Sequence, residues 1–149
     1  MIEINNLTDF AVDKAYFLGV AKKVLKGENK ETENLSVAFV SADQIRNINK
    51  EYRKKNKPTD VLSFEKSPNV QGRASHIFEG DFLEVVICPA FVQEKTGRGQ
   101  TPSGSKLKEE LAKCLIHGIL HSLGYDHERS REQAKIMFEK QDFYFSEVR

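Results

Sequence analysis

Three of the four histidines in this 149-residue sequence lie within a single short run, at positions 117, 121 and 127. His117 and His121 are four residues apart, so on a helix both imidazoles lie on one face. Gly124 can adopt the left-handed conformation that ends a helix and reverses the chain, which returns His127 towards the other two. Three imidazoles with a fourth position left to water are typical of a catalytic zinc site, whereas a structural site usually has four protein ligands. The spacing therefore predicts one zinc ion (Zn²⁺) per chain, bound by His117, His121 and His127.

The same spacing, His-x-x-x-His-x-x-Gly-x-x-His, is that of the metzincin proteases. Those enzymes carry a glutamate directly after the first histidine, where it acts as the general base. The residue at that position here is Gly118, which cannot accept a proton. A metallohydrolase acting on peptides or amides therefore remains an alternative, but its usual base is missing.

The run His-Gly-x-Leu-His-x-x-Gly-Tyr-Asp-His, from His117 to His127, resembles the signature of the YbeY family of metal-dependent, single-strand-specific endoribonucleases. A second block is similar to the other characteristic segment of that family, and it consists of Asn49, Tyr52, Arg53 and residues 58–64. The resemblance continues more weakly over residues 35–138. Two positions depart from the family pattern, namely Ser122, which is usually apolar, and Leu83, where a glycine commonly precedes the acidic residue, here Glu84.

The resemblance implies a single-strand-specific, zinc-dependent endoribonuclease that hydrolyses RNA phosphodiester bonds. It would act in maturation of the 3′ end of small-subunit ribosomal RNA and in ribosome quality control. Its partners would be single-stranded RNA, ribosomal RNA and the ribosomal small subunit, and we expect neither DNA nor a membrane among them. A ribosome-associated binding factor with a structural metal is a further alternative.

Two residues outside the triad are catalytic candidates. Arg53 coincides with the arginine of the family, and a guanidinium group suits the charge that develops on a phosphoryl group during hydrolysis. Asp126, beside the third histidine, has three open roles: to orient a histidine, to act as a base, or to stabilise the turn. Asp60 could likewise cap a strand or belong to the site. The basic residues near Arg53 could follow an RNA backbone or be merely solvated charge, and they are Arg46, Lys50, Lys54, Lys55 and Lys57.

Composition indicates one soluble domain over residues 1–149. Hydrophobic residues make up 39% and charged residues 30% of the chain, and the net charge of +1 gives no sign of a nucleic-acid binder by itself. The start of the chain has no signal-peptide pattern and no apolar segment is long enough to span a bilayer, so we expect a cytoplasmic protein. Cys88 and Cys114 are expected to be reduced in that compartment.

Hydrophobic periodicity predicts an α+β fold: a single domain with a mixed sheet of about four strands packed with helices, and the metal site on a central helix. Strand order does not follow from the sequence. The expected strands cover residues 2–4, 35–40, 61–64 and 82–88. The expected helices cover residues 9–26, a stretch from Ser41 to before Pro58, 90–95, a stretch from Ser103 or Ser105 to Gly124, and 130–140.

Local signals refine these expectations. Thr8 or Asp9 is expected to cap the first helix and Gly27 to end it, with residues 27–34 forming a polar surface connection. Ser41 and Gln44 have the form of a capping box. In the last helix Ala134, Met137 and Phe138 are expected to face the core. Residues 65–80 read as a loop, in which His76 is interpreted as a solvated side chain.

Overall fold

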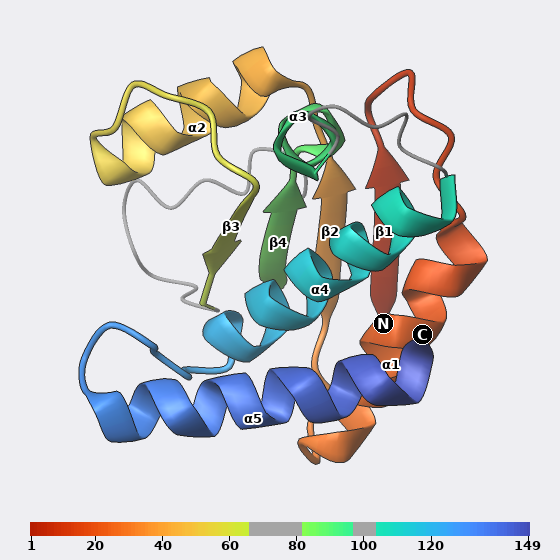
Figure 1. Cartoon of the computed structure of the whole chain (residues 1–149), viewed down its shortest axis with the longest axis vertical. Helices are drawn as coiled ribbons and strands as arrows, with labels where there is room; N and C mark the ends of the chain where they lie inside the picture. Colours follow the sequence, from red (N-terminus) through yellow and green to blue (C-terminus); the bar gives the residue numbers. More distant parts are fainter. Residues whose placement is uncertain (66–81, 97–103) are drawn as a thin grey trace.

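The computed structural model describes residues 1–65, 82–96 and 104–149, and in these ranges it contains one four-stranded sheet. Its strands lie in the order β1-β2-β4-β3, with bounds Ile2–Asn6 for β1, Leu35–Phe39 for β2, Leu83–Ile87 for β4 and Val61–Phe64 for β3 (Figure 1). β1, β2 and β4 are parallel, whereas β3 runs antiparallel to β4. The sheet is therefore mixed, as predicted.

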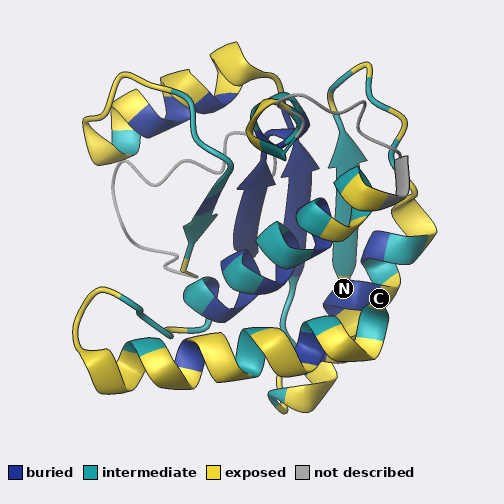
Figure 2. Cartoon of the chain, in the orientation of Figure 1, coloured by how far each residue is buried: buried dark blue, intermediate teal, exposed yellow. Residues whose placement is uncertain are grey.

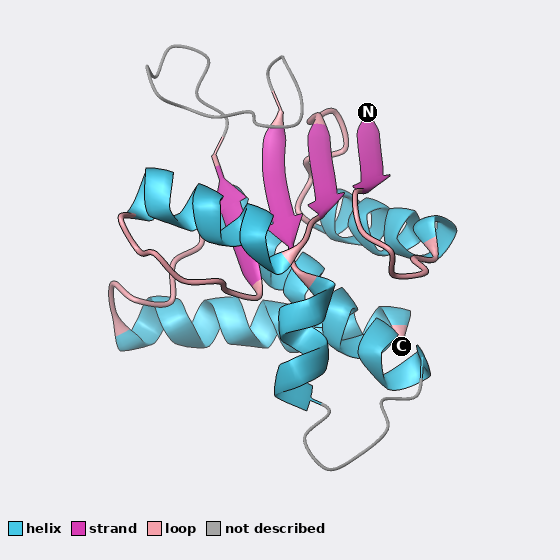
Figure 3. Ribbon diagram, turned by 90° about the horizontal axis from the view of Figure 1, so that it is seen from above, coloured by secondary structure: helices cyan, strands magenta, loops and turns pink. Residues whose placement is uncertain are grey.

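Helices pack on both faces of this sheet. They are α1 (Lys14–Gly27), α2 (Ala42–Arg53), α3 (Pro89–Thr96), α4 (Gly104–Ser122) and α5 (Arg131–Val148). The larger core cluster joins α1, α4 and α5 to one face of β2 and β4, and a smaller cluster joins α2 to the other face. Seen from above, the four strands lie side by side with the helices around them (Figure 3).

Helix α4 is the central element of the fold, as expected for the helix that carries the first two histidines. It contacts β3, β4, α1, α3 and α5, and in Figure 1 it crosses the front of the sheet. Ile116, Ile119 and Leu120 on its inner side are fully buried, while the neighbouring His117 and His121 are only half-buried. The central strands β2 and β4 are buried along their whole length, whereas β1 and most of β3 are half-buried (Figure 2).

The prediction for the start of α1 is wrong by several residues. The helix begins at Lys14, and its N-cap is Asp13, whose side chain accepts a hydrogen bond from the Tyr16 backbone N–H at 3.1 Å. Thr8 instead donates its hydroxyl to Asn6 Oδ1 at 2.6 Å, and its backbone N–H reaches the same oxygen at 3.0 Å. These local side-chain bonds satisfy the backbone in a turn, so residues 8–13 are not helical.

The other element boundaries are mostly close to those predicted. Ser41 and Gln44 form the expected capping box of α2. The helix ends at Arg53 because Lys54 is left-handed (φ 59°), well before Pro58. Pro89, expected to end a strand, also begins α3. His76 and Ser103 lie outside the described residues.

Helix α5 is longer than predicted, since it continues to Val148 instead of ending near residue 140. Its final turns are anchored by Tyr144, which is buried, and by Phe145 and Val148, which pack against the core. Met137 faces inward as predicted and Ala134 is half-buried, but Phe138 is 45% exposed, so its assignment to the core is wrong.

Two further expectations concern chemistry outside the site. Cys88 and Cys114 are free thiols, in agreement with the expectation of reduced cysteines. Among the helices that the structure describes, none combines the length and the apolar character needed to cross a membrane.

Candidate metal centre

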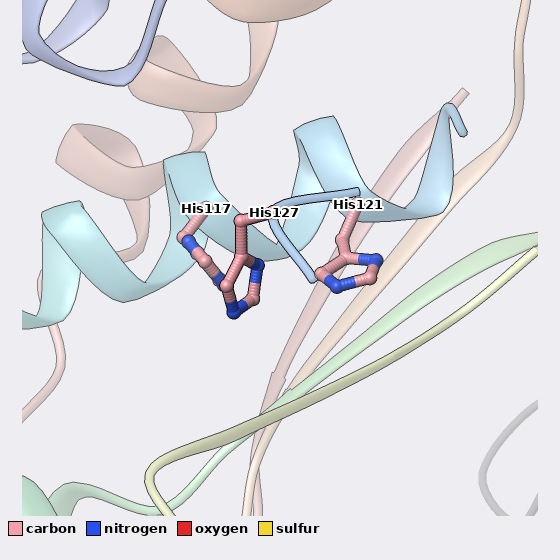
Figure 4. A group of neighbouring side chains, drawn as sticks. All are labelled: His117, His121 and His127. Carbon is pink, nitrogen blue, oxygen red and sulfur yellow. The ribbon is translucent and has the colours of Figure 1, made fainter. Parts of the chain in front are cut away.

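The three histidines gather on one side of α4. His117 and His121 project from successive turns of the helix, and His127 returns from the loop that follows it (Figure 4). The ring centroids are 5.7 Å apart for His117 and His121, 5.1 Å for His117 and His127, and 5.5 Å for His121 and His127. One ring nitrogen of each residue lies within 4.8 Å of the others, so the three side chains could hold a single metal ion.

The turn that returns His127 is built on Gly124, whose φ is +105°. The Tyr125 N–H donates to the Leu120 carbonyl at 3.1 Å, and the Gly124 N–H donates to the His121 carbonyl at 3.0 Å. These two bonds form a Schellman motif, which satisfies the last carbonyls of α4 and requires a left-handed residue after the helix. The predicted role of Gly124 is thus confirmed by its backbone geometry.

His117 is prepared to donate a lone pair. Its Nδ1 lies 2.9 Å from Gln141 Oε1 on α5, and because an amide oxygen only accepts, Nδ1 carries the proton and Nε2 keeps its lone pair. Burial lowers the pKa of His117, and the neighbouring His127 and His121 lower it further, against the opposing effect of the Gln141 bond. The imidazole is therefore neutral at pH 7, as a metal ligand must be.

His127 provides the observation that best tests the fit of an ion. Its Nδ1 is buried and has no hydrogen-bond partner in the part of the chain that the structure describes. A buried polar atom without a partner costs about 1–3 kcal/mol. A metal ion bound at that nitrogen would supply the missing partner, so the donor set fits a divalent ion that prefers imidazole, such as zinc.

Gly118 packs α4 closely onto the sheet. A Cβ atom at this position would lie 2.6 Å from Cγ1 of Val85 and 3.2 Å from Cγ2 of Val61. Val85 is fully buried in the core, so it has no room to move aside. A glutamate here, as in the metzincin proteases, would be directed into the sheet, and the position is therefore one of packing.

A cavity of about 500 Å³ opens beside the triad. Both catalytic candidates, Arg53 and Asp126, line it together with the three histidines. Among the described residues the lining consists of Arg53, residues 59–64, His117, His121 and residues 126–128. Arg53 is the last residue of α2 and its side chain is exposed to solvent. The second sequence block thus meets the first across this cavity, although they are more than fifty residues apart in the chain.

The bonds of Asp126 are with its own loop. Its Oδ1 accepts the Glu128 N–H at 2.8 Å, and its Oδ2 lies 3.3 Å from Nε of Arg129. The backbone bond from Glu128 is the main cause that lowers the pKa of Asp126. No hydrogen bond joins Asp126 to a histidine within the described ranges. Of the three roles left open by the sequence, turn stabilisation is therefore the one with visible contacts.

Two more carboxylates line the cavity. Asp60 accepts the Val61 N–H at 2.8 Å and lies 3.6 Å from Nζ of Lys95, so it caps the entry to β3 while facing the site. Glu128, which is not among the site residues predicted from the sequence, has its Oε1 at 3.9 Å from Nε2 of His127. Its position directly after the third histidine was the only signal that could have identified it.

The loop that carries His127 is anchored by Glu28, a residue that the sequence placed in a polar surface connection. Residues 29–32 of that connection are exposed, as predicted, but Glu28 is an exception, because its side chain is only 5% exposed. Its Oε1 accepts the Tyr125 hydroxyl at 2.6 Å, and its Oε2 accepts the Tyr144 hydroxyl and lies 3.1 Å from Nζ of Lys140. The C-terminal end of α1 is thereby tied both to the loop after α4 and to α5.

Helix α1 ends at Gly27, as predicted, but the glycine is the last helical residue and the left-handed residue beyond it is Asn29, with a φ of 58°. Gly27 has a second role, in packing. A Cβ atom on Gly27 would lie 2.5 Å from Cε1 and 2.8 Å from Cζ of Tyr144. The glycine is therefore required because it lets Tyr144 approach α1 and reach Glu28.

The two departures from the family pattern are accommodated locally. Ser122 is buried and donates its hydroxyl to the Ile119 carbonyl at 2.7 Å, so the polar group is satisfied within α4. Leu83 is buried in β4, where it pairs with Leu35 of β2. Neither residue lines the cavity beside the triad.

Comparison with protein families gives one match that covers nearly the whole chain. Residues 3–149 match the family model described as Endoribonuclease YbeY.

Individual proteins with known names or structures are similar over comparable lengths. The chain is 37% identical to an "Endoribonuclease YbeY" from Persephonella marina, over 96% of this chain and 88% of the relative. It is 36% identical to one from a Sulfurihydrogenibium species, over 92% of this chain and 84% of the relative. The solution structure of a Thermotoga maritima protein superposes with a TM-score of 0.65 at 30% identity, covering 99% of this chain and 89% of the other.

Proposed function

The chain belongs to the endoribonuclease YbeY family, and from this premise we propose that His117, His121 and His127 hold one zinc ion with which it hydrolyses single-stranded RNA. The enzyme class, an RNA-cleaving hydrolase, follows from the family. The observation that supports the proposed site is the triad itself, with its ring nitrogens within 4.8 Å of one another at the wall of a cavity. Zinc is preferred because three neutral imidazoles suit it.

When bound, a zinc ion would supply Lewis acidity, lowering the pKa of water to about 7 and polarising a phosphoryl oxygen. The chain's own residues prepare the site for it. Gln141 holds the proton on His117 Nδ1 and thereby aims Nε2 at the triad. The Schellman turn at Gly124 fixes the return of His127.

Arg53 is proposed to neutralise charge on the scissile phosphodiester. Its guanidinium lies on the wall of the same cavity as the triad, and it can donate two parallel hydrogen bonds to a phosphate. In hydrolysis the non-bridging oxygens gain negative charge, so a fixed cation there stabilises the transition state more than the ground state. We therefore expect Arg53→Lys to lower kcat more than it raises KM.

The proton acceptor is proposed to be a carboxylate of the loop after α4. Asp126 and Glu128 both line the cavity. Asp126 is committed to the Glu128 N–H and to Arg129, whereas the Glu128 carboxylate is largely exposed. Asp126→Asn would then disturb the loop, and Glu128→Gln would remove an acceptor while leaving the loop's backbone bond in place.

Basic residues around α2 are proposed to follow the RNA backbone towards the cavity. Arg46, Lys50, Lys54, Lys55 and Lys57 all lie on or directly after this helix, which ends at Arg53. Arg46 lies 3.1 Å from Asp43, so part of its charge is already neutralised. Phosphate contacts of this kind give affinity that falls with salt and carries no sequence preference.

The biological substrate is proposed from the family. Maturation of the 3′ end of small-subunit ribosomal RNA and ribosome quality control would make ribosomal RNA and the small subunit its partners. Action on that substrate would take place in the cytoplasm. Peptide hydrolysis is disfavoured because Gly118 leaves no room for the base of metzincin proteases.

The test is cleavage of a structured RNA with a single-stranded tail. Four samples are compared: the purified protein, metal-stripped protein, stripped protein with added zinc, and His121→Ala. We expect cutting confined to the tail, lost on stripping, restored by zinc and absent in the variant. Equal cutting by all four samples would show that the triad is not the catalytic site.

A structural role for the metal predicts a different result in the same samples. The three histidines are only half-buried at the cavity, whereas apolar side chains pack α1, α4 and α5 on the sheet, so we expect stripped protein to keep its helical circular dichroism. Unfolding upon metal removal would instead favour the binding-factor alternative.

A further inference from the structure

Phe138 is a large apolar side chain left exposed beside the triad. It lies on α5 and is 45% exposed, although the preceding residue, Met137, is fully buried. Its ring centroid is 5.8 Å from that of His127, with the two planes inclined by 50°. Gln141, one turn further along α5, binds His117. This side of α5 therefore borders the triad, and Phe138 presents an aromatic surface to solvent at that border.

We propose that Phe138 is a specificity-determining residue that stacks against the base of a nucleotide adjoining the scissile phosphate. The inference deepens the proposed function and rests on it. A phosphodiester held at the triad and Arg53 carries a nucleotide on each side, and an exposed ring next to His127 is placed to meet one of their bases. Base–aromatic stacking is tolerant of sequence because every base offers a flat face.

This contact would also contribute to the preference for single strands. In a duplex both faces of each base are covered by its neighbours, so a protein ring can stack only on a base that has been unstacked. An unpaired tail offers such a base at little cost. The preference for single strands would then come from two features: the cavity admits a flexible backbone, and the ring of Phe138 binds an unstacked base.

Two other phenylalanines of the described residues are less suited to this role. Phe143 on the same helix is 57% exposed, but its ring packs edge-on against Tyr144 with centroids 5.3 Å apart. Phe64 lines the cavity, but it is partly buried and packs against the core cluster on the α2 side of the sheet, so it offers less free ring surface than Phe138. Phe143 thus serves as a matched control: an exposed phenylalanine of α5 that contacts Tyr144, not the triad.

The experiment couples a protein change to an RNA change. Wild type, Phe138→Leu, Phe138→Trp and Phe143→Leu are assayed on a set of short single-stranded RNAs in which one abasic nucleotide is moved along the chain. Zinc content and melting temperature are measured for each variant, and RNA affinity is measured by fluorescence anisotropy on stripped protein.

The proposal expects Phe138→Leu to lower kcat/KM and RNA affinity on the order of 10- to 100-fold on intact RNA. Phe138→Trp keeps an aromatic face and should retain most of the affinity that Phe138→Leu loses, while Phe143→Leu should remain close to wild type. An abasic nucleotide at one position should lower the kcat/KM of wild type by a similar factor, because that RNA lacks the base that stacks on Phe138. The same RNA should leave the kcat/KM of Phe138→Leu nearly unchanged. Zinc content should be equal in all variants.

Two outcomes would overturn the proposal while leaving the nuclease function intact. One is an unchanged kcat/KM for Phe138→Leu. The other is a loss that is the same at every abasic position and is accompanied by lower zinc content, which would show that Phe138 only supports His127. If wild type cleaves none of the RNAs, the proposed function itself fails, and this inference fails with it.

Discussion

Replacing Glu28 should weaken both the fold and the metal site, although the residue lies outside the cavity. Its buried carboxylate accepts hydrogen bonds from Tyr125, Tyr144 and Lys140, which belong to the loop before His127 and to α5. Glu28→Ala removes the acceptor for all three donors at once. The loop that carries the third histidine then loses its attachment to α1.

The size of the effect follows from the burial of these groups. Breaking a buried ion pair by removing one partner costs about 3–5 kcal/mol. Lys140 is 37% exposed, so water can partly replace its lost partner and the lower end of that range is expected. For a domain of this size, about 3 kcal/mol corresponds to a fall in Tm of roughly 6–12 °C. Glu28→Gln keeps an acceptor oxygen and should lose about 1–2 kcal/mol.

The assay has a thermal and a metal-binding part. Melting curves of stripped protein give the loss of stability for Glu28→Ala and Glu28→Gln. Zinc affinity is measured by competition with a chelator, and we expect it to fall by about 10- to 100-fold in Glu28→Ala, as for other residues that support metal ligands. Tyr144→Phe is the control, because it removes the hydrogen bond from α5 to Glu28 and leaves the bond from Tyr125 to Glu28 intact.

A Tm for Glu28→Ala within a degree of wild type would refute the proposed role of Glu28 in stability. A fall in stability without any change in zinc affinity would refute only its role at the metal site. That second result would mean that His127 is held by its own turn alone, without help from Tyr125.

Three further predictions concern glycines and pH. Gly27→Ala should destabilise the protein by about 1–3 kcal/mol, because its Cβ would overlap a buried tyrosine ring, whereas Gly19→Ala in the same helix should stabilise it by about 0.5–1 kcal/mol; chemical denaturation measures both. Gly118→Ala should cost about 1–3 kcal/mol of stability and move α4 off the sheet, so zinc affinity should fall together with stability. A loss of stability with unchanged zinc affinity would contradict this prediction. Burial raises the pKa of Glu28, but hydrogen bonds from two tyrosines and a lysine outweigh burial and lower it. The stabilisation by Glu28 is therefore complete above about pH 4.5 and is lost as the pH falls below that value. The Tm of Glu28→Gln should accordingly fall less steeply with acid than the Tm of wild type.

The triad could be predicted from the sequence because its geometry is local. The spacing of His117 and His121 is set by one helical turn, and Gly124 signals the reversal that brings back His127. The capping box of α2 was recognisable for the same reason, since both partners lie within one turn. What depends on a few consecutive dihedral angles can be inferred from residue types alone.

The residues that support the triad could not be predicted, because their contacts span long stretches of chain. Gln141 binds a histidine 24 positions away, and Glu28 binds tyrosines 97 and 116 positions away. Glu28 and its polar neighbours read as a surface loop until the packing of α5 is known. Phe138 fits the apolar periodicity of a core-facing residue. Periodicity alone cannot show that this side of α5 faces the histidine triad instead of the core.

The first helix shows a local failure with a local cause. Thr8 and Asp9 resemble an N-cap as well as Asp13 does, and the helical pattern extends back to Phe10. The hydrogen bonds of Thr8 to Asn6 and of the Phe10 N–H to Thr8 compete with helix formation, and these bonds decide the boundary.

One zinc ion bound by the three histidines is proposed to make this chain a nuclease. The most direct test is to titrate zinc into stripped protein while measuring bound zinc and RNA cleavage in the same samples. We expect the cleavage rate to rise in proportion to bound zinc and to reach its plateau at one ion per chain, with neither bound zinc nor cleavage in His121→Ala. Full cleavage by protein that contains no metal, or cleavage by His121→Ala at the wild-type rate, would contradict this expectation.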